Sequence, residues 1–110
     1  MSKESSSNSN RLAGVNALIL SSLADGAKHG YALTQDIEQF ASVRVSAGTL
    51  YEALARLEKL GLIEPAESID RRRPYRLTAE GAAALSDYLA EQARLVAEGQ
   101  RRLKSGWNPA

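Results

Sequence analysis

Several residue types are scarce in this chain of 110 residues or missing from it. Cysteine is absent, which excludes disulfides, thiolate zinc sites and cysteine nucleophiles. His29 is the only histidine, so one chain offers neither a histidine-containing catalytic triad nor a multi-histidine metal site. Neither a paired acid and base nor a phosphate-cradling glycine loop is recognisable. We therefore expect a protein that is not an enzyme and has no catalytic residue, cofactor or metal.

Long apolar runs are also missing. No stretch of about 18 apolar residues occurs, as a membrane-spanning helix would require. The start, MSKESSSNSN, is polar where a signal peptide has an apolar segment. We expect a soluble, cytoplasmic protein without a membrane partner. Because a Ser/Asn-rich segment cannot offset its ordering entropy by burial, residues 1–10 are predicted to form a disordered tail.

What is present fits one small globular domain. The chain is 44% hydrophobic and 25% charged, with a formal net charge of only +1. A chain of this size leaves much apolar surface uncovered, so a partner subunit is expected. The positive charge is clustered: the segment RRRPYR, residues 71–76, holds four arginines and no acid. Clustering of this kind on one face bears on nucleic-acid binding more than net charge does.

Three helices are predicted in the first half of the chain. The first begins near Leu12 and has apolar residues at helical spacing up to Leu23. The second is YALTQDIEQFA, residues 31–41, with Ile37 and Phe40 on its apolar face and Tyr31 expected in the core. The third follows Ser46, a suitable N-cap, and ends before Gly61, which tolerates a positive φ. These helices are separated by short segments rich in glycine, serine or valine.

After Gly61 the periodicity changes to that of short strands. LIEPAES and PYRLT, on either side of the basic segment, predict a small hairpin with a basic tip. Tyr75 and Leu77 should face one side of this hairpin, with Tyr75 in the core, and Arg76 the other.

A long last helix, residues 79–104, follows the cap residue Thr78, and residues 105–110 form a frayed end. Its apolar positions alternate in steps of four and three, as in a coiled-coil seam, and its length exceeds about 30 Å, so much of it needs a second chain. A homodimer interface is predicted from the seam and its neighbours together with the first helix: Leu12, Val15, Leu85, Tyr88, Leu89, Gln92, Val96 and Leu103.

The order of these elements predicts the fold class: mainly α with a small β-hairpin, a winged helix-turn-helix in residues 11–78 and a C-terminal dimerisation helix in residues 79–104. The third helix starts with small residues that let its backbone approach double-stranded DNA closely, while Thr49 and Tyr51 lie where such a helix reads base edges. The basic hairpin would contact the DNA backbone or the adjacent minor groove. The predicted DNA-binding residues are His29, Ser46, Gly48, Thr49, Tyr51, Arg56, Arg71, Arg72 and Arg73.

Three segments also resemble a known family. HGYAL, VSAGTLYEALARLEKLGLIE and RRRPYRLTAEGAAAL are similar, in this order and spacing, to the PadR family of bacterial transcriptional regulators, roughly from Leu18 to Leu85. The resemblance implies a homodimeric repressor of the small subgroup with a single C-terminal helix. It places Ser46, Thr49 and Tyr51 on the DNA face. The chain departs from the family pattern where proline is frequent and this sequence has Ala47 and Glu52.

Other interpretations remain open on the sequence. His29 either touches a phosphate or only closes the turn before Gly30. Trp107 either lines a pocket for a small aromatic effector between subunits, as aromatic residues do in some relatives, or is merely terminal. The chain as a whole is either a repressor on a pseudo-palindromic operator, released by a small molecule, or a winged-helix module that binds proteins or small molecules without specific DNA binding.

Overall fold

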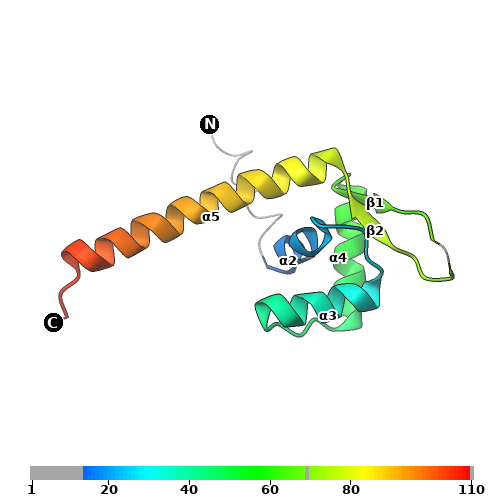
Figure 1. Cartoon of the computed structure of the whole chain (residues 1–110), viewed down its shortest axis with the longest axis horizontal. Coiled ribbons are helices and arrows are strands. Elements are labelled where there is room, and N and C mark those ends of the chain that lie inside the picture. Colours follow the sequence, from blue (N-terminus) through cyan, green and yellow to red (C-terminus); the bar gives the residue numbers. More distant parts are fainter. Residues whose placement is uncertain (1–13, 69, 110) are drawn as a thin grey trace.

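The computed structural model describes residues 14–68 and 70–109. The predicted tail 1–10 and the interface residue Leu12 lie outside the described residues. Within them the elements are α2 (Val15–Leu23), α3 (Gly30–Ala41), α4 (Ala47–Lys59), β1 (Ile63–Pro65), β2 (Tyr75–Leu77) and α5 (Ala79–Gly106). This order agrees with the predicted fold class, a mainly helical protein with one small hairpin and a long last helix (Figure 1).

Helices α2, α3 and α4 enclose the core. Each buries one apolar side: Ile19 and Leu20 of α2, Leu33 and Ile37 of α3, and a row of leucines at i, i+4 and i+7 in α4. Helix α4 begins at the predicted cap, because the Ser46 side chain accepts a hydrogen bond from the Thr49 backbone N–H. After the C-cap of α4, Gly61 has φ 80°, the left-handed conformation that glycine adopts at low cost.

Two aromatic positions of α3 differ from the sequence prediction. Tyr31 is 68% exposed and Phe40 is 51% exposed, although the sequence pattern predicts both on the buried face. Tyr31 is two residues from Leu33, which turns it about 200° away from the buried side of a helix. Phe40 has the right spacing, but it lies in the last turn of α3, where the chain leaves the core.

The hairpin of β1 and β2 forms the base of the wing, the name used here for residues 63–77. Its strands pair antiparallel, with Ile63 opposite Leu77 and Pro65 opposite Tyr75. Lys28 exchanges two backbone hydrogen bonds with Tyr75, of 3.0 and 2.9 Å, and so ties the segment before α3 to β2. Tyr75 is buried as predicted, and the loop between the strands projects away from the helices (Figure 1).

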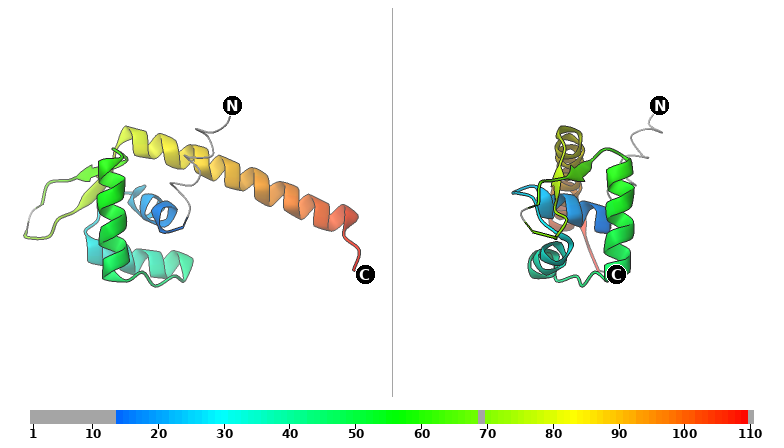
Figure 2. Two further views of the ribbon diagram at one scale, coloured as in Figure 1. Left: turned by 180° about the vertical axis from the view of Figure 1, so that it is seen from behind. Right: turned by 90° about the vertical axis from the view of Figure 1, so that its right-hand side faces the viewer.

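Helix α5 starts on the body of the molecule and then leaves it. The Thr78 side chain caps its first turn by accepting from the Gly81 N–H. Gly81 lies so close to the residue before β1 that an added Cβ would be 2.0 Å from the Leu62 carbonyl oxygen and 3.2 Å from Leu77 Cδ2, which brings the start of α5 against the base of the wing. Only Gly81 and Leu85 are buried among the residues of α5. The helix has 28 residues and ends at Gly106, two residues past the predicted boundary. Seen from behind, its second half extends beyond the other helices (Figure 2, left).

Candidate nucleic-acid interface

The first turn of α4 presents a polar, ordered edge to solvent. Ser46 Oγ accepts from the Thr49 N–H at 3.2 Å and also bonds Thr49 Oγ1 at 3.0 Å. Residues 46–49 are all exposed, and a Cβ added to Gly48 would meet nothing within 4 Å. The turn therefore combines unobstructed backbone N–H groups with a fixed Thr49 hydroxyl, an arrangement that suits an anionic partner.

Tyr51 packs on the start of α3. A Cβ added to Gly30 would lie 2.4 Å from Tyr51 Oη and 2.9 Å from Cζ, so the glycine makes room for the phenol ring. The Tyr51 side chain is still 55% exposed. The second turn of α4 and the N-terminus of α3 thus share one surface.

The wing loop is shaped by a short turn around Asp70. Asp70 Oδ1 accepts from the Arg72 backbone N–H at 2.9 Å, and its Oδ2 lies 3.9 Å from Arg72 Nε. Ser68 Oγ lies within hydrogen-bonding distance of the carbonyl oxygens of Asp70 and Arg72, and its one proton can be donated to either of them or shared between them. These contacts fix the backbone at the start of the arginine triplet, whose three side chains remain exposed.

The wing arginines and the N-terminus of α3 enclose a hollow of about 400 Å³. His29 caps α3 through Nδ1, which accepts from the Ala32 N–H at 3.3 Å, and its Nε2 lies 3.0 Å from Arg72 Nη1. The described residues that line the hollow include three arginines and no carboxylate: His29, Gly30, Tyr31, Tyr51, Arg71, Arg72, Arg73 and Tyr75. The hollow therefore has the electrostatics of an anion site.

Tyr31 is an exposed residue of this surface that the sequence pattern places in the core instead. Its hydroxyl accepts from Gln35 Nε2 at 3.0 Å, which leaves the hydroxyl proton free to donate. The spacing from Leu33 already indicates that Tyr31 is exposed, because residues two positions apart on a helix lie on nearly opposite sides.

Two other arginines point away from this cluster. Arg76 Nε donates to Glu64 across the hairpin at 2.9 Å. Arg56 Nη2 donates at 3.1 Å to Asn16, a 7% exposed residue of α2. Arg76 thus supports the wing, as the alternation in β2 indicates, and Arg56 links α4 to α2.

One carboxyl group near the entrance to α3 has a perturbed pKa. Lys28 Nζ bonds Asp25 Oδ1 at 2.7 Å, and this hydrogen bond, together with the positive charge of Lys28, lowers the pKa of Asp25.

No group of three or more potential metal-binding side chains occurs within residues 14–68 and 70–109. In the same residues, none of the helices has the combination of length and apolarity needed to cross a membrane.

The comparison with known proteins agrees with this architecture. A model of the PadR-like family of transcriptional regulators matches residues 19–87. The chain belongs to this family. Transcriptional regulator Rv3488 of Mycobacterium tuberculosis is 43% identical over 94 residues, which cover 80% of this chain and 87% of that protein. A 37.1 kDa protein of transposon TN4556 from Streptomyces fradiae is 46% identical over 78 residues; the match covers 71% of this chain but only 23% of that protein.

Solved PadR structures share the fold of this PadR-like chain. A PadR regulator from Clostridium difficile R20291 has a TM-score of 0.67 at 26% identity, with 81% of this chain and 96% of that chain covered. One from Eggerthella lenta has a TM-score of 0.68 at 27% identity, with 94% and 93% covered. The family resemblance seen in the sequence and the winged-helix fold are thus confirmed, and the protein is a PadR-family transcriptional regulator. This family consists of regulators rather than enzymes.

Proposed function

We propose that this protein is a homodimeric, cytoplasmic repressor that binds double-stranded DNA at a pseudo-palindromic operator. The observation that carries the proposal is the acid-free hollow between the wing and α3, lined by Arg71, Arg72 and Arg73 beside the exposed second turn of α4. A surface of this kind matches the phosphate backbone, which supplies most of the affinity of DNA-binding proteins.

Helix α4 is assigned to the major groove. Ser46 and Gly48 lie at its start, where backbone N–H groups can approach a phosphate, and Thr49 and Tyr51 follow at the positions from which a recognition helix contacts base edges. Arg56 lies two turns further along α4 and already donates to Asn16. Its contact with DNA is part of the proposal, and it would have to keep or exchange that hydrogen bond.

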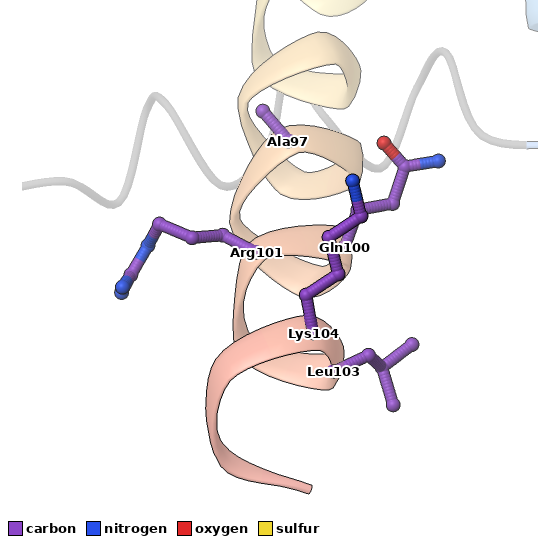
Figure 3. A pocket seen from close by; sticks show the side chains of 5 residues that line it. All are labelled: Ala97, Gln100, Arg101, Leu103 and Lys104. Atoms are coloured by element: carbon purple, nitrogen blue, oxygen red, sulfur yellow. The ribbon is translucent and has the colours of Figure 1, made fainter.

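Helix α5 is assigned to the dimer interface. Leu89, Val96 and Leu103 follow one another at intervals of seven residues and are 48%, 55% and 62% exposed, whereas a coiled-coil seam buries such positions. Near the end of α5, Leu103 and Gln100 point to one side of the helix and Arg101 to the other (Figure 3), beside a hollow of about 680 Å³. Half-buried Val15, Tyr88 and Gln92 flank this surface at the body.

Release of the operator by a small aromatic molecule completes the proposal. Trp107 is 66% exposed and lines a hollow of about 500 Å³ with the last residues of α5. A second subunit on the α5 seam would cover part of this surface, and an apolar aromatic face is a suitable contact for a planar ligand.

The test of DNA binding is the salt dependence of affinity for a random-sequence duplex. Replacing Arg71, Arg72 and Arg73 together by alanine should weaken binding to all sequences. The slope of log K against log salt should become shallower by roughly 0.9 for each phosphate that the variant no longer neutralises. Fluorescence anisotropy at several salt concentrations measures both quantities.

Arg76→Ala is the matched control, because Arg76 lies in the same hairpin but pairs with Glu64. It should leave the slope almost unchanged. An unchanged slope in the triple variant would contradict the wing assignment. A wild-type protein without affinity for random duplex at low salt would instead favour a winged-helix module that docks proteins or small molecules.

A further inference from the structure

His29 makes one contact through each of its two ring nitrogens, and the partner in both contacts is a hydrogen-bond donor. Its Nδ1 accepts the Ala32 N–H at 3.3 Å and thereby caps α3. Its Nε2 lies 3.0 Å from Nη1 of Arg72, a group that can only donate. The two contacts would both require an unprotonated ring nitrogen.

A neutral imidazole has only one such nitrogen. If Nδ1 accepts the cap hydrogen bond, Nε2 carries the proton and cannot accept from Arg72. If Nε2 accepts from Arg72, Nδ1 carries the proton and α3 has no side-chain cap. A doubly protonated ring satisfies neither contact. In the capped form, therefore, the Nε2–H and the Arg72 guanidinium are two donors that converge on one point.

The surroundings of this point favour an oxygen anion as the missing acceptor. Asp70 holds the Arg72 backbone N–H and approaches the guanidinium at Nε, so Nη1 is directed toward His29. Tyr31 can donate its hydroxyl proton, since its oxygen accepts a hydrogen bond from Gln35. Both Tyr31 and the flanking Arg71 and Arg73 line the same hollow. A phosphate group has enough oxygens to accept from several of these donors at once.

We propose that His29 and Arg72 form a phosphate clamp that joins the N-terminus of α3 to the wing. When it is occupied, one phosphate oxygen accepts from His29 Nε2–H and another from the Arg72 guanidinium, while His29 Nδ1 keeps capping α3. The proposal rests on the function proposed above in one respect, namely that a DNA backbone phosphate is one source of this group. Free phosphate is the other source with the same chemistry.

His29→Asn separates the clamp from the cap. Asparagine is as good an N-cap as the helix can have, but its side chain is shorter and has no group in the position of Nε2. On random duplex this variant should lose about tenfold in affinity, as expected for one hydrogen bond to a charged group. Its salt slope should stay close to the wild-type slope, because the His29 ring of the clamp is neutral and Arg72 still neutralises the phosphate. Unchanged circular dichroism and melting temperature would show that the fold is intact.

A double-mutant cycle with Arg72→Gln tests whether the two residues act together. The clamp predicts that Arg72→Gln costs clearly less affinity in the His29→Asn background than in the wild-type protein. Fully additive effects, or a His29→Asn affinity equal to that of the wild-type protein, would overturn the clamp while leaving DNA binding in place. Arg76→Gln in both backgrounds is the control, and it should be additive.

Because His29 is the only histidine, the ring nitrogens can be observed directly by ¹⁵N NMR. Titration with inorganic phosphate and, separately, with a short duplex should leave the ring neutral with the proton on Nε2. A change in the ring ¹⁵N chemical shifts on adding inorganic phosphate supports a site open to free phosphate. A change only on adding duplex supports the DNA backbone as the source of the phosphate group. No response to either, an Nδ1–H ring or a doubly protonated ring in the bound state contradicts the clamp. This readout remains valid if wild-type protein binds no DNA, a result that would remove the proposed function instead.

Discussion

At the scale of single residues, the proposed interface depends on where one glycine leaves space. Gly30 lies against the Tyr51 ring, with Tyr51 Oη only 2.4 Å from the position of a Cβ. The atom in conflict is the end of a long side chain, which can move, rather than backbone. A methyl group at residue 30 therefore displaces Tyr51 without requiring the helices to separate.

We expect Gly30→Ala to reduce sequence preference rather than stability. If Tyr51 contacts a base edge, its displacement should cost roughly 1–3 kcal/mol of discrimination per base pair affected. The same reduction should follow from Tyr51→Ala, and Gly30→Ala should then have little additional effect in the Tyr51→Ala background. Binding to operator and to random duplex, measured side by side, gives the discrimination. Equal reductions on both duplexes would remove Tyr51 from the base-reading role.

Residue-level reasoning from sequence is sound where chemistry is local. Ser46 and Thr78 cap their helices as predicted, because a cap needs only a side-chain oxygen and an N–H three residues away. The same reasoning is wrong for Tyr31, an aromatic residue predicted in the core, and it leaves two roles open for His29. The structure shows that His29 is an N-cap, but its contact with Arg72, 43 positions away, depends on how the wing folds back.

At the scale of elements, α5 is stabilised by ion pairs along its exposed side. Glu98 accepts from Arg101 Nη2 and Arg102 Nε, both at 2.6 Å, three and four residues further along the helix. These hydrogen bonds lower the pKa of Glu98 below its ordinary value of 4.5, and the one from Arg101 has the largest effect. Such pairs support a helix that has few tertiary contacts in one chain.

Lowering the pH should therefore reduce the helix content of α5, because it protonates Glu98. A carboxyl group whose pKa is lower in the folded state stabilises that state fully above its ordinary value, and the contribution disappears as pH falls through the lowered one. Glu98→Gln should reduce helicity slightly at pH 6 and make no difference near pH 2, by circular dichroism. Glu67→Gln, in the wing loop, makes the same charge change outside α5 and should not affect its helicity. A Glu98→Gln protein with wild-type pH dependence would contradict this account.

At the scale of the whole molecule, an exposed helix half leads to a prediction about assembly. Replacing Leu89 and Val96 by lysine should separate the proposed dimer, since each apolar side chain contributes about 1.5–3 kcal/mol when buried. Ala83→Lys with Ala90→Lys adds the same charge, at the same spacing, at exposed positions on a different side of α5, and should keep the assembly intact. Sedimentation equilibrium distinguishes a mass of 11.9 kDa from about twice that value. Wild-type protein with the mass of one chain would contradict the dimer.

Two such subunits would carry two copies of α4 related by a two-fold axis. The proposed dimer then requires operator half-sites about 34 Å apart, or a multiple of this distance, because each recognition helix needs a major groove on the same face of the duplex. This geometry connects the α5 interface to the DNA surface. Neither the α5 interface nor the DNA surface can be predicted from the composition of a single chain.

The sequence by itself determined the elements, their order, their caps and the family. Helical and strand periodicity, cap residues and glycine positions act over a few residues, so they can be read without knowing what packs against them. Only the tertiary structure decided which functional residues meet. The hollow brings together residues 29–31, Tyr51, residues 71–73 and Tyr75, and separates Arg56 and Arg76 from them. The physical reason is that side-chain contacts across the chain depend on the packing of α3, α4 and the wing, and periodicity carries no information about distances between segments.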